Sequence, residues 1–268
     1  MHLNEDEFAK LDHYVRSSFG LNMENKQYLV EARLSAELVR GGYSSFPEYW
    51  SSLILDKSGA MAARLSDCLT TNYTYFCREE KHFAYIRTAL LPKLQGPLSI
   101  WCAGCATGQE SYTLAMLLAD SRDMGRLPYD YHIIATDLSN EALETADTGI
   151  YHQADYERLP ESWRKRYCLI QPDGDFIVAT RIRDTVHYMR QNLMDTRPGS
   201  NRFDFVFCRN VLIYFRDHER AIVVQNLFDS LKPGGLLFIG HAESLLSCET
   251  DFEYIIPAIY RKPEGAKC

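Results

Sequence analysis

The sequence has no apolar run of about 18 residues, the length that a membrane-spanning helix approaches. The apolar stretch "TLAMLLA", at residues 113–119, is far too short to cross a bilayer. The first residues, "MHLNEDEFAKL", are acidic and amphipathic, unlike a secretion signal. We therefore expect a cytoplasmic protein that is not inserted in a membrane.

Disulfide and zinc signatures are also missing. The eight cysteines are scattered along the chain, and several lie in apolar, strand-like runs. Cys102 and Cys105 form a C-x-x-C, but no second pair and no histidine pair has the spacing of a zinc site. We expect reduced thiols, as in cytoplasmic proteins, and no bound metal.

An excess of positive charge is absent as well. The formal net charge is -7, which argues against broad affinity for a phosphate backbone, so we expect no nucleic-acid partner. With 46% hydrophobic and 12% aromatic residues, the chain can build a sizeable core. Its 268 residues allow one large domain or one domain with a smaller companion, and no internal repeat is visible.

The first part of the chain shows helical periodicity. Apolar residues recur at helical spacing in five segments, namely 5–20, 25–42, 45–55, 61–70 and 79–94. Gly20 and Gly41 are suitable helix ends, and Ser45 before Pro47 is a suitable helix start. We predict a small all-helical N-terminal domain over residues 1–92.

From about residue 97, short apolar strands alternate with helices. We expect strands within 97–104, 131–137, 185–193, 203–211 and 236–243, helices within 109–121, 139–149 and 216–235, and a hairpin at 251–262. The alternation predicts a mostly parallel sheet covered on both faces, so residues 93–268 form an α/β domain. Residues 150–184 break the alternation, and a Pro-Asp-Gly turn there indicates a small inserted antiparallel ribbon.

Polar residues and glycines follow the predicted parallel strands, where such sheets bind ligands. Gly104 lies in the turn "AGCATG" after the first strand, and glycine lets the backbone approach a ligand closely. Asp137 ends the second strand, where a carboxylate can accept bonds from ribose hydroxyls. Asn192 and Asn210 lie at the ends of the next two predicted parallel strands. Alternatively, Asp137 caps the helix that begins at Ser139, and the asparagines are ordinary turn residues.

Motifs that are absent from this region narrow the choice of ligand class. The glycine set of a dinucleotide site is incomplete, and no phosphate-binding G-x-x-x-x-G-K-[ST] occurs, which disfavours a nicotinamide dehydrogenase or an ATP site. No catalytic Ser-His or Cys-His arrangement is legible. S-adenosylmethionine fits better, because it presents ribose, adenine and an amino acid end but no phosphate.

Several segments resemble a known family when they are taken in order. They are "TTNYTYFCRE", "AGCATGQESYTLAM", "ATDLS", "FDFVFCRNVLIYF", "LKPGGLLFIGHAES" and the closing "AIYRK". Together they closely resemble the chemotaxis receptor methyltransferases of the CheR type, over almost the whole chain. The resemblance implies a Rossmann-like class I methyltransferase domain behind the helical domain, with residues 150–184 as an inserted β subdomain.

The resemblance also implies an activity. It is transfer of a methyl group from S-adenosylmethionine to glutamate side chains of chemoreceptors, giving methyl esters and S-adenosylhomocysteine in sensory adaptation. Matching positions for the cofactor, together with Gly104 of the turn, are Asn72, Thr74, Arg78, Glu110, Asp137, Asn192, Leu193, Arg209 and Asn210. The segment "TTNYTYFCRE" would face the cofactor from the helical side. The alternative is that Thr70 or Asn72 merely caps a helix.

Two residues are candidates for the chemistry itself. Glutamate is ionised at neutral pH, so its carboxylate needs no general base to attack a sulfonium methyl group. Arg78 is the residue we expect to orient that carboxylate, since its planar fork suits two oxygens. Tyr214 is expected to be the second contact near the methyl group. A buried ion pair and a core tyrosine are the alternatives.

Partner surfaces are suggested by charge and by loop length. Lys26, Arg33 and Arg40 recur every seven residues on the second predicted helix and share a face, which the resemblance makes a candidate for docking an acidic receptor helix bundle. Glu37 can instead pair with Arg33. The ribbon connection "QPDG" is too tight for the longer loop that holds a receptor's C-terminal peptide in some members, so we predict no such tether.

Rival functions remain open at this point. They are a methyltransferase of the same fold acting on another protein, a nucleic-acid methyltransferase, and a non-catalytic cofactor-binding sensor. The acidic charge disfavours the second rival, and the presence of both Arg78 and Tyr214 disfavours the third. We expect a monomer.

Overall fold

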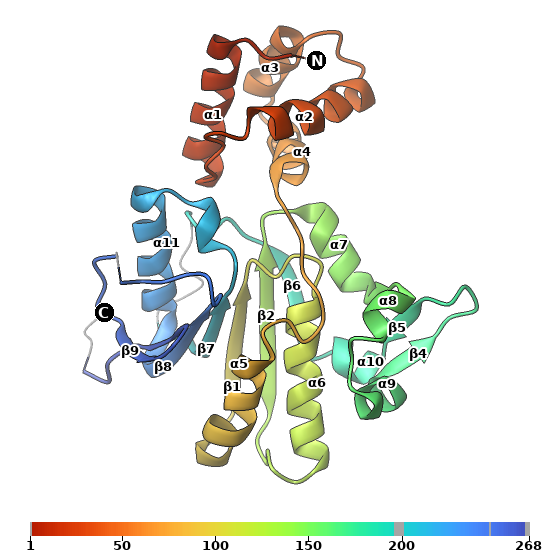
Figure 1. The fold of residues 1–268 in the computed structure, drawn as a ribbon, viewed down its shortest axis with the longest axis vertical. Coiled ribbons are helices and arrows are strands. Elements are labelled where there is room, and N and C mark those ends of the chain that lie inside the picture. Colours follow the sequence, from red (N-terminus) through yellow and green to blue (C-terminus); the bar gives the residue numbers. More distant parts are fainter. Residues whose placement is uncertain (1, 196–200, 247, 266–268) are drawn as a thin grey trace.

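The computed structural model describes residues 2–195, 201–246 and 248–265. A helical domain stands at one end of an α/β domain, and a smaller subdomain projects from the side of the latter (Figure 1). The helical domain contains α1 (Glu5–Phe19), α2 (Gln27–Gly41), α3 (Phe46–Leu55) and α4 (Ala60–Leu69). Within the described ranges, no helix is long and apolar enough to span a membrane.

The first helix shows how local sequence sets these elements. Asn4 Oδ1 accepts the Glu7 N–H at 2.9 Å, and Glu7 Oε2 accepts the Asn4 N–H at 3.0 Å, which is a capping box. The helix ends at Gly20, whose φ of 75° suits a residue without a Cβ. Its apolar face, including Leu11 and Val15, joins one cluster of buried side chains drawn from residues 3–69. The four helices predicted over this range are confirmed.

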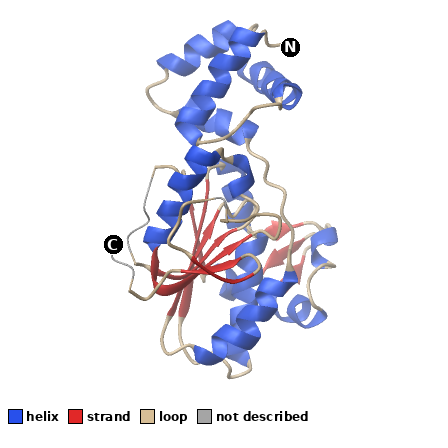
Figure 2. Cartoon of the chain, turned by 60° about the vertical axis from the view of Figure 1, so that its left-hand side comes forward, coloured by secondary structure: helices blue, strands red, loops and turns tan. Residues whose placement is uncertain are grey.

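The α/β domain is built on a seven-stranded sheet in the order β6-β2-β1-β7-β8-β10-β9. The first five strands in that order are parallel, and the C-terminal hairpin adds two antiparallel ones (Figure 2). Their bounds are β1 Leu98–Ala103, β2 Tyr131–Asp137, β6 Val186–Arg190, β7 Phe203–Cys208, β8 Leu231–Ile239, β9 Glu253–Ile256 and β10 Ile259–Arg261. The chain order reverses beside β1, which has β2 on one side and β7 on the other.

Alternate residues of each strand pack on opposite faces of the sheet. Ile100 and Cys102 of β1 join the cluster that includes α6 (Gln109–Asp123), and Trp101 joins the cluster that includes α11 (Asp217–Ser230). A third helix, α7 (Asn140–Thr148), packs against β2 and β6. The predicted sheet with both faces covered is confirmed.

The inserted subdomain lies where the sequence predicts it. Its strands β3 (Ile150–Tyr151), β4 (Cys168–Ile170) and β5 (Phe176–Val178) form a separate antiparallel sheet in the order β3-β5-β4. Short helices α8 (Gln153–Tyr156), α9 (Glu161–Tyr167) and α10 (Thr180–Arg183) accompany it. The β4–β5 connection is a tight turn, closed by the Gly174 N–H, which donates to the Gln171 carbonyl at 3.1 Å.

The structure corrects the expected end of the helical domain. The fifth predicted helix is α5 (Glu80–Tyr85), followed by a π-helical turn (Ile86–Leu90) and a 3-10 turn (Leu91–Lys93). Phe83, Ile86 and Leu91 pack in the core of the α/β domain. The two cores therefore divide near residue 70 rather than 92, because the apolar face of α5 covers the sheet and not the other helices.

The predicted helix over residues 216–235 is also too long. It ends at Ser230, and Leu231 begins β8. The Gly234 N–H donates to the Lys262 carbonyl at 2.8 Å, and the Lys262 N–H donates to the Gly235 carbonyl at 2.9 Å. Pairing with the C-terminal strand thus takes the Pro-Gly-Gly segment into the sheet.

Candidate cofactor and active site

A cavity of about 420 Å³ lies between the helical domain and the carboxyl ends of the parallel strands. One wall comes from α1, α2 and the loop between them. A second wall is the segment of residues 69–74 with Arg78, and the third follows the ends of β1, β2, β6 and β7. Figure 1 shows residues 70–79 passing from α4 down to α5 as an extended connection. The cavity is therefore at the reversal of strand order, where such sheets bind ligands.

Every candidate cofactor or catalytic residue from the sequence lines this cavity. They are Asn72, Thr74, Arg78, Gly104, Glu110, Asp137, Asn192, Leu193, Arg209, Asn210 and Tyr214. These residues come from five separate parts of the chain. Their convergence on one cavity is the property that a binding site requires, and it does not by itself define the ligand.

Gly104 permits the close approach of two strand ends. Its φ is 78°, and a Cβ built there would lie 2.5 Å from Cγ2 of Val211, in the loop after β7. Both the backbone conformation and the space therefore exclude a larger residue without rearrangement. The absence of a side chain at Gly104 therefore lets the turn after β1 lie close to the loop after β7 at the cavity.

Asp137 is buried and held by the backbone around it. Its Oδ2 accepts the Ala106 N–H at 2.8 Å, and its Oδ1 accepts the Ser139 N–H at 2.9 Å. Burial raises the pKa of Asp137, and these two N–H groups act against that rise. The α7 cap is Ser139, whose hydroxyl accepts the Ala142 N–H at 3.2 Å. Asp137 thus shapes the end of β2 and presents a fixed carboxylate to the cavity.

Arg209 is occupied by protein groups. Its Nη1 lies 2.8 Å from Glu110 Oε2, its Nη2 lies 3.0 Å from Glu79 Oε2, and Nη2 also donates to the Arg78 carbonyl. Burial raises the pKa of Glu110, and Arg209 opposes that rise. Since the Arg209 side chain is 1% exposed, we interpret it as a clamp that fixes Glu110 and the chain at Arg78.

Glu243 was missed by the sequence reasoning. Its Oε2 accepts the N–H groups of Asn210 at 2.8 Å and Gly240 at 2.6 Å, and its Oε1 accepts that of Ile213 at 3.3 Å. It therefore holds the loop after β7, where Asn210 has a φ of 59°. Among the described residues, buried Asn210 Oδ1 has no hydrogen-bond partner, so this acceptor remains for a ligand or water.

Asn192 and Leu193 have other partners in this structure. Asn192 Nδ2 donates to the Ser18 carbonyl at 2.8 Å, and Asn192 Oδ1 accepts the Met194 N–H at 3.1 Å. The carbonyl of Leu193 accepts from Asn226 Nδ2 at 2.9 Å. Asn192 thus connects the end of β6 to the helical domain. Its amide already has protein partners, so it can offer fewer hydrogen bonds to a ligand than the sequence suggested.

The segment "TTNYTYFCRE" connects two helices, since it begins at the C-cap of α4 and ends at Glu79, the N-cap of α5. Thr70 is the C-cap of α4, so the alternative that Thr70 caps a helix holds, whereas Asn72 is not a cap of α4 or α5. Arg78 Nη1 donates to the Tyr73 carbonyl at 2.9 Å, and its guanidinium lies 5.6 Å from the centre of the Tyr75 ring. The neighbours of Arg78, at positions 77 and 79, have φ values of 59° and 56°. Such conformations cost about 1–3 kcal/mol each, which is typical of functional sites.

Tyr214 lies at the junction of the two domains. The Asn22 N–H donates to the Tyr214 carbonyl at 2.8 Å, and Leu21 forms an isolated antiparallel bridge with Phe215. The Lys26 ammonium lies 5.5 Å from the centre of the Tyr214 ring. The loop between α1 and α2 therefore braces the loop after β7.

The expected stripe of positive charge on α2 does not form one free surface. Arg33 donates to the carbonyls of Leu69 and Thr70 at 2.8 and 2.9 Å and fastens the start of the connection to α5. Lys26 and Arg33 line the cavity, whereas Arg40 contacts Glu141 of α7 at 3.5 Å. The suggested Arg33–Glu37 pair is wrong, because Glu37 contacts Arg40 and Arg64.

The helical wall of the cavity is largely apolar, which the sequence reasoning missed. Its side chains include Phe19, Leu21, Met23 and Val30, and all four are buried. Helical periodicity identifies such residues as core, and it gives no signal that part of this core faces a cavity.

Comparisons with known proteins agree with this architecture. Residues 72–259 match the family described as CheR methyltransferase, SAM binding domain. The chemotaxis protein methyltransferase of Borreliella burgdorferi is 36% identical over 98% of this chain and 96% of its own length. The corresponding protein of Vibrio parahaemolyticus is 31% identical over 94% of each. Chemotaxis protein methyltransferase 1 of Pseudomonas aeruginosa is 34% identical over 86% of this chain and 87% of its own.

The chain belongs to the CheR methyltransferase family. Its fold is accordingly a helical N-terminal region followed by a Rossmann-like S-adenosylmethionine methyltransferase domain. Among solved structures, a SAM-dependent methyltransferase from Methanosarcina mazei shares 21% identity, with a TM-score of 0.33 over 55% of this chain and 53% of its own. A likeness at that level carries no argument about function.

The residues of the cavity fit S-adenosylmethionine. A fixed carboxylate, Asp137, stands at the end of β2, and Asn210 Oδ1 is a buried acceptor without a partner among the described residues. Arg209 is neutralised by two carboxylates, so it does not form a phosphate site. This donor set suits a nucleoside that carries no phosphate.

Proposed function

We propose that the protein transfers methyl groups from S-adenosylmethionine to glutamate side chains in the cytoplasmic domain of chemoreceptors. The products are glutamate 5-O-methyl esters and S-adenosylhomocysteine. The observation that carries the proposal is the contrast between the two arginines of the cavity. Arg209 is saturated by protein oxygens, whereas Arg78 donates one hydrogen bond among the described residues, to the Tyr73 carbonyl.

The cofactor is held at the polar edge of the sheet in this proposal. Asp137 accepts the ribose hydroxyls, and Asn210 Oδ1 takes a donor from the adenine or the amino acid end. Asn72, Thr74 and Glu110 supply further polar contacts from the cavity wall. Gly104 leaves the room that a side chain would fill.

Arg78 orients the substrate. Its guanidinium is planar and can donate two parallel hydrogen bonds to a carboxylate. The rings of Tyr73 and Tyr75 lie 5.8 and 5.6 Å from it and limit its rotation. Tyr214, on the opposite loop, provides the second contact near the reacting oxygen.

Little acid–base chemistry is required. When bound, S-adenosylmethionine supplies an electrophilic methyl group on a positively charged sulfur. The substrate carboxylate is already ionised near neutral pH, so the chain's task is to align that oxygen and to exclude water from it. The apolar helical wall performs the second task.

The helical domain forms the receptor side of the enzyme. Lys26 is half-buried at the cavity, and burial, with a contribution from Arg33, lowers its pKa. We propose that Lys26 and the exposed Tyr28 beside it contact the receptor helix next to the modified glutamate. We also expect the enzyme to act in the cytoplasm, where the receptor domain lies.

The test uses S-adenosylmethionine labelled in its methyl group, a purified receptor cytoplasmic domain and the full-length protein. The expected result is label on the receptor domain that is released by mild base, as a carboxylate ester requires. Asp137→Ala, which we expect to bind the cofactor more weakly, is the matched variant and should transfer less label at limiting cofactor concentration. Label that resists base, or bound cofactor without any transfer to receptor domains, would contradict the proposal.

A further inference from the structure

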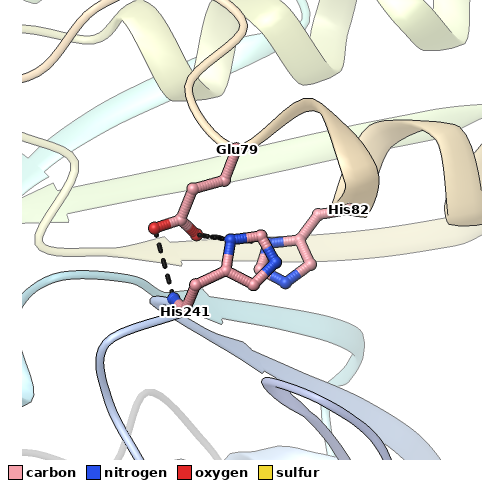
Figure 3. Close-up of side chains that lie close together, drawn as sticks. All are labelled: Glu79, His82 and His241. Atoms are coloured by element: carbon pink, nitrogen blue, oxygen red, sulfur yellow. Dashed lines mark hydrogen bonds and ion pairs between the residues drawn. The ribbon is translucent and has the colours of Figure 1, made fainter.

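Three metal-ligating side chains meet behind the cavity, at the start of α5 and the end of β8. Glu79, His82 and His241 each offer one ligand atom, and these atoms lie within 4.8 Å of one another. Figure 3 shows the Glu79 carboxylate directed at His241, with the two imidazole rings side by side. None of the three lines the cavity.

The separations suit a bound ion. His241 Nδ1 is 3.4 Å from Glu79 Oε2, and His82 Nδ1 is 3.7 Å from the same oxygen. Two ligands of a tetrahedral zinc ion, each about 2.0–2.1 Å from the metal, are roughly 3.3 Å apart. The two rings are stacked, with centroids 4.6 Å apart and planes 29° apart, so the half-exposed His241 ring must rotate for both imidazoles to face one ion.

The unsatisfied state of His82 is the second observation. Its side chain is 2% exposed, yet neither ring nitrogen has a hydrogen-bond partner among the described residues. A buried polar group without a partner is costly, and in native proteins such a group commonly binds an ion or a water molecule.

The local charge is compatible with a cation. Arg209 donates to Glu79 Oε2, the oxygen nearest both rings, at 3.0 Å, and also to Glu110, so Glu79 Oε1 is the carboxylate oxygen left for the ion. Two carboxylates and one guanidinium leave an excess of one negative charge, and the neutral imidazoles add none. His241 is 37% exposed, which gives an ion access from solvent.

We propose that Glu79, His82 and His241 form a binding site for one divalent transition-metal ion, with zinc the best match. Two imidazoles and one carboxylate are a common ligand set for such ions, and a water completes the coordination. The sequence reasoning missed this set because its members are not at zinc-motif spacing. Glu79 and His241 are 162 residues apart.

Cobalt(II) is the probe that tests this site, since its absorption reports both geometry and ligand type. Metal-stripped full-length protein is titrated with Co²⁺ and then with competing Zn²⁺. The expected result is one equivalent of Co²⁺ with visible absorption bands of four- or five-coordination and no thiolate charge-transfer band. The last point separates the site from the free cysteines.

Variants locate the binding. His241→Ala and Glu79→Gln should each weaken Co²⁺ binding by at least about tenfold, whereas His13→Ala, an exposed histidine of α1, should leave it unchanged. Circular dichroism establishes that each variant is folded. Thiolate bands, or equal affinity in wild type and folded His241→Ala, would overturn the proposal, as would the absence of binding.

Discussion

The two sides of the cavity are constructed differently. The sheet side consists of strand ends whose polar groups are fixed by backbone hydrogen bonds, as with Asp137 and Glu243. The helical side consists of an apolar wall and an extended connection, fastened by side chains such as Arg33. One side is rigid because it belongs to a sheet, and the other depends on a few contacts.

The sides are joined both by apolar packing, with Leu138 and Tyr214 against the helical core, and by polar contacts. Asn22 N–H donates to the Tyr214 carbonyl, Asn192 donates to the Ser18 carbonyl, and Arg216 contacts Glu24 at 3.1 Å. We infer that the sheet edge sets cofactor affinity, and that the helical side sets substrate alignment.

The largest expected effect concerns Arg78. Arg78→Lys keeps the charge but loses the planar fork, so methyl transfer should fall about 100-fold while cofactor affinity stays within about threefold. Rates from labelled-methyl assays and affinities from calorimetry check this. Arg158→Lys is the matched control, because Arg158 lies 4.6 Å from the same Tyr75 ring and does not line the cavity. Normal turnover in Arg78→Lys would make Arg78 a structural residue.

Substitution of Asp137 should mainly affect cofactor affinity, in contrast to substitution of Arg78, which should mainly affect turnover. Asp137→Ala should weaken S-adenosylhomocysteine binding by about 1.5–3 kcal/mol, the usual scale for a hydrogen bond to a charged group. Calorimetry measures it. Asp67→Ala is the control, since the Asp67 carboxylate accepts the Asn140 N–H at 2.6 Å near the same helix but outside the cavity. An unchanged affinity in folded Asp137→Ala removes Asp137 from the site.

The His82 ring packs against Phe238 of β8, at the end of the connection from α4 to α5. Its titration predicts how the stability of the protein depends on pH. The pKa of His82 is about 3 in the folded protein and near 6.5 in the unfolded chain. Between about pH 6.5 and about pH 3 the unfolded chain therefore binds protons preferentially, so the folded state loses stability as the pH is lowered. Relative to His82→Leu, the metal-free wild type should lose about 2 kcal/mol between about pH 7.5 and about pH 5. Urea titrations with a chelator check this, and parallel pH profiles would contradict it.

The contact between the domains should have a smaller effect. Arg216→Ala removes pairs with Glu24 and Asp12 at 3.1 and 3.9 Å, and should cost at most about 1 kcal/mol of stability because the side chain is partly exposed. We expect KM for the receptor to rise a few-fold at unchanged cofactor affinity. Arg261→Ala, which breaks a surface pair with Glu253, is the control. A loss of cofactor affinity in Arg216→Ala would mean that the two sides are not separable.

No effect is expected from a tether peptide. The turn from Gln171 to Asp175 is closed by the Gln171 N–H, which donates to the Asp175 carbonyl at 2.8 Å, and it leaves little loop to hold a peptide. A receptor C-terminal peptide titrated against the protein should therefore show no binding. Micromolar affinity would overturn this prediction.

The division between the sides also explains what the sequence could reveal. Gly104, Asp137 and Asn210 were found because strand ends have local signals, and the parallel sheet brings them together. The partners of Arg209 and His241 could not be found, because Glu79 lies 130 and 162 residues from them. The domain to which α5 belongs was likewise misjudged, because its packing on the sheet is not a property of its own sequence.

The central claim is that the sheet edge holds the cofactor, that Arg78 holds the substrate carboxylate, and that neither side supplies a general base. Single-turnover methyl transfer from labelled S-adenosylmethionine to the receptor domain, measured from about pH 6 to about pH 9, tests it directly. Because the glutamate is ionised throughout this range, the account predicts a rate that is independent of pH. A rate that falls below an apparent pKa near 7 would show that a base takes part and would contradict the account.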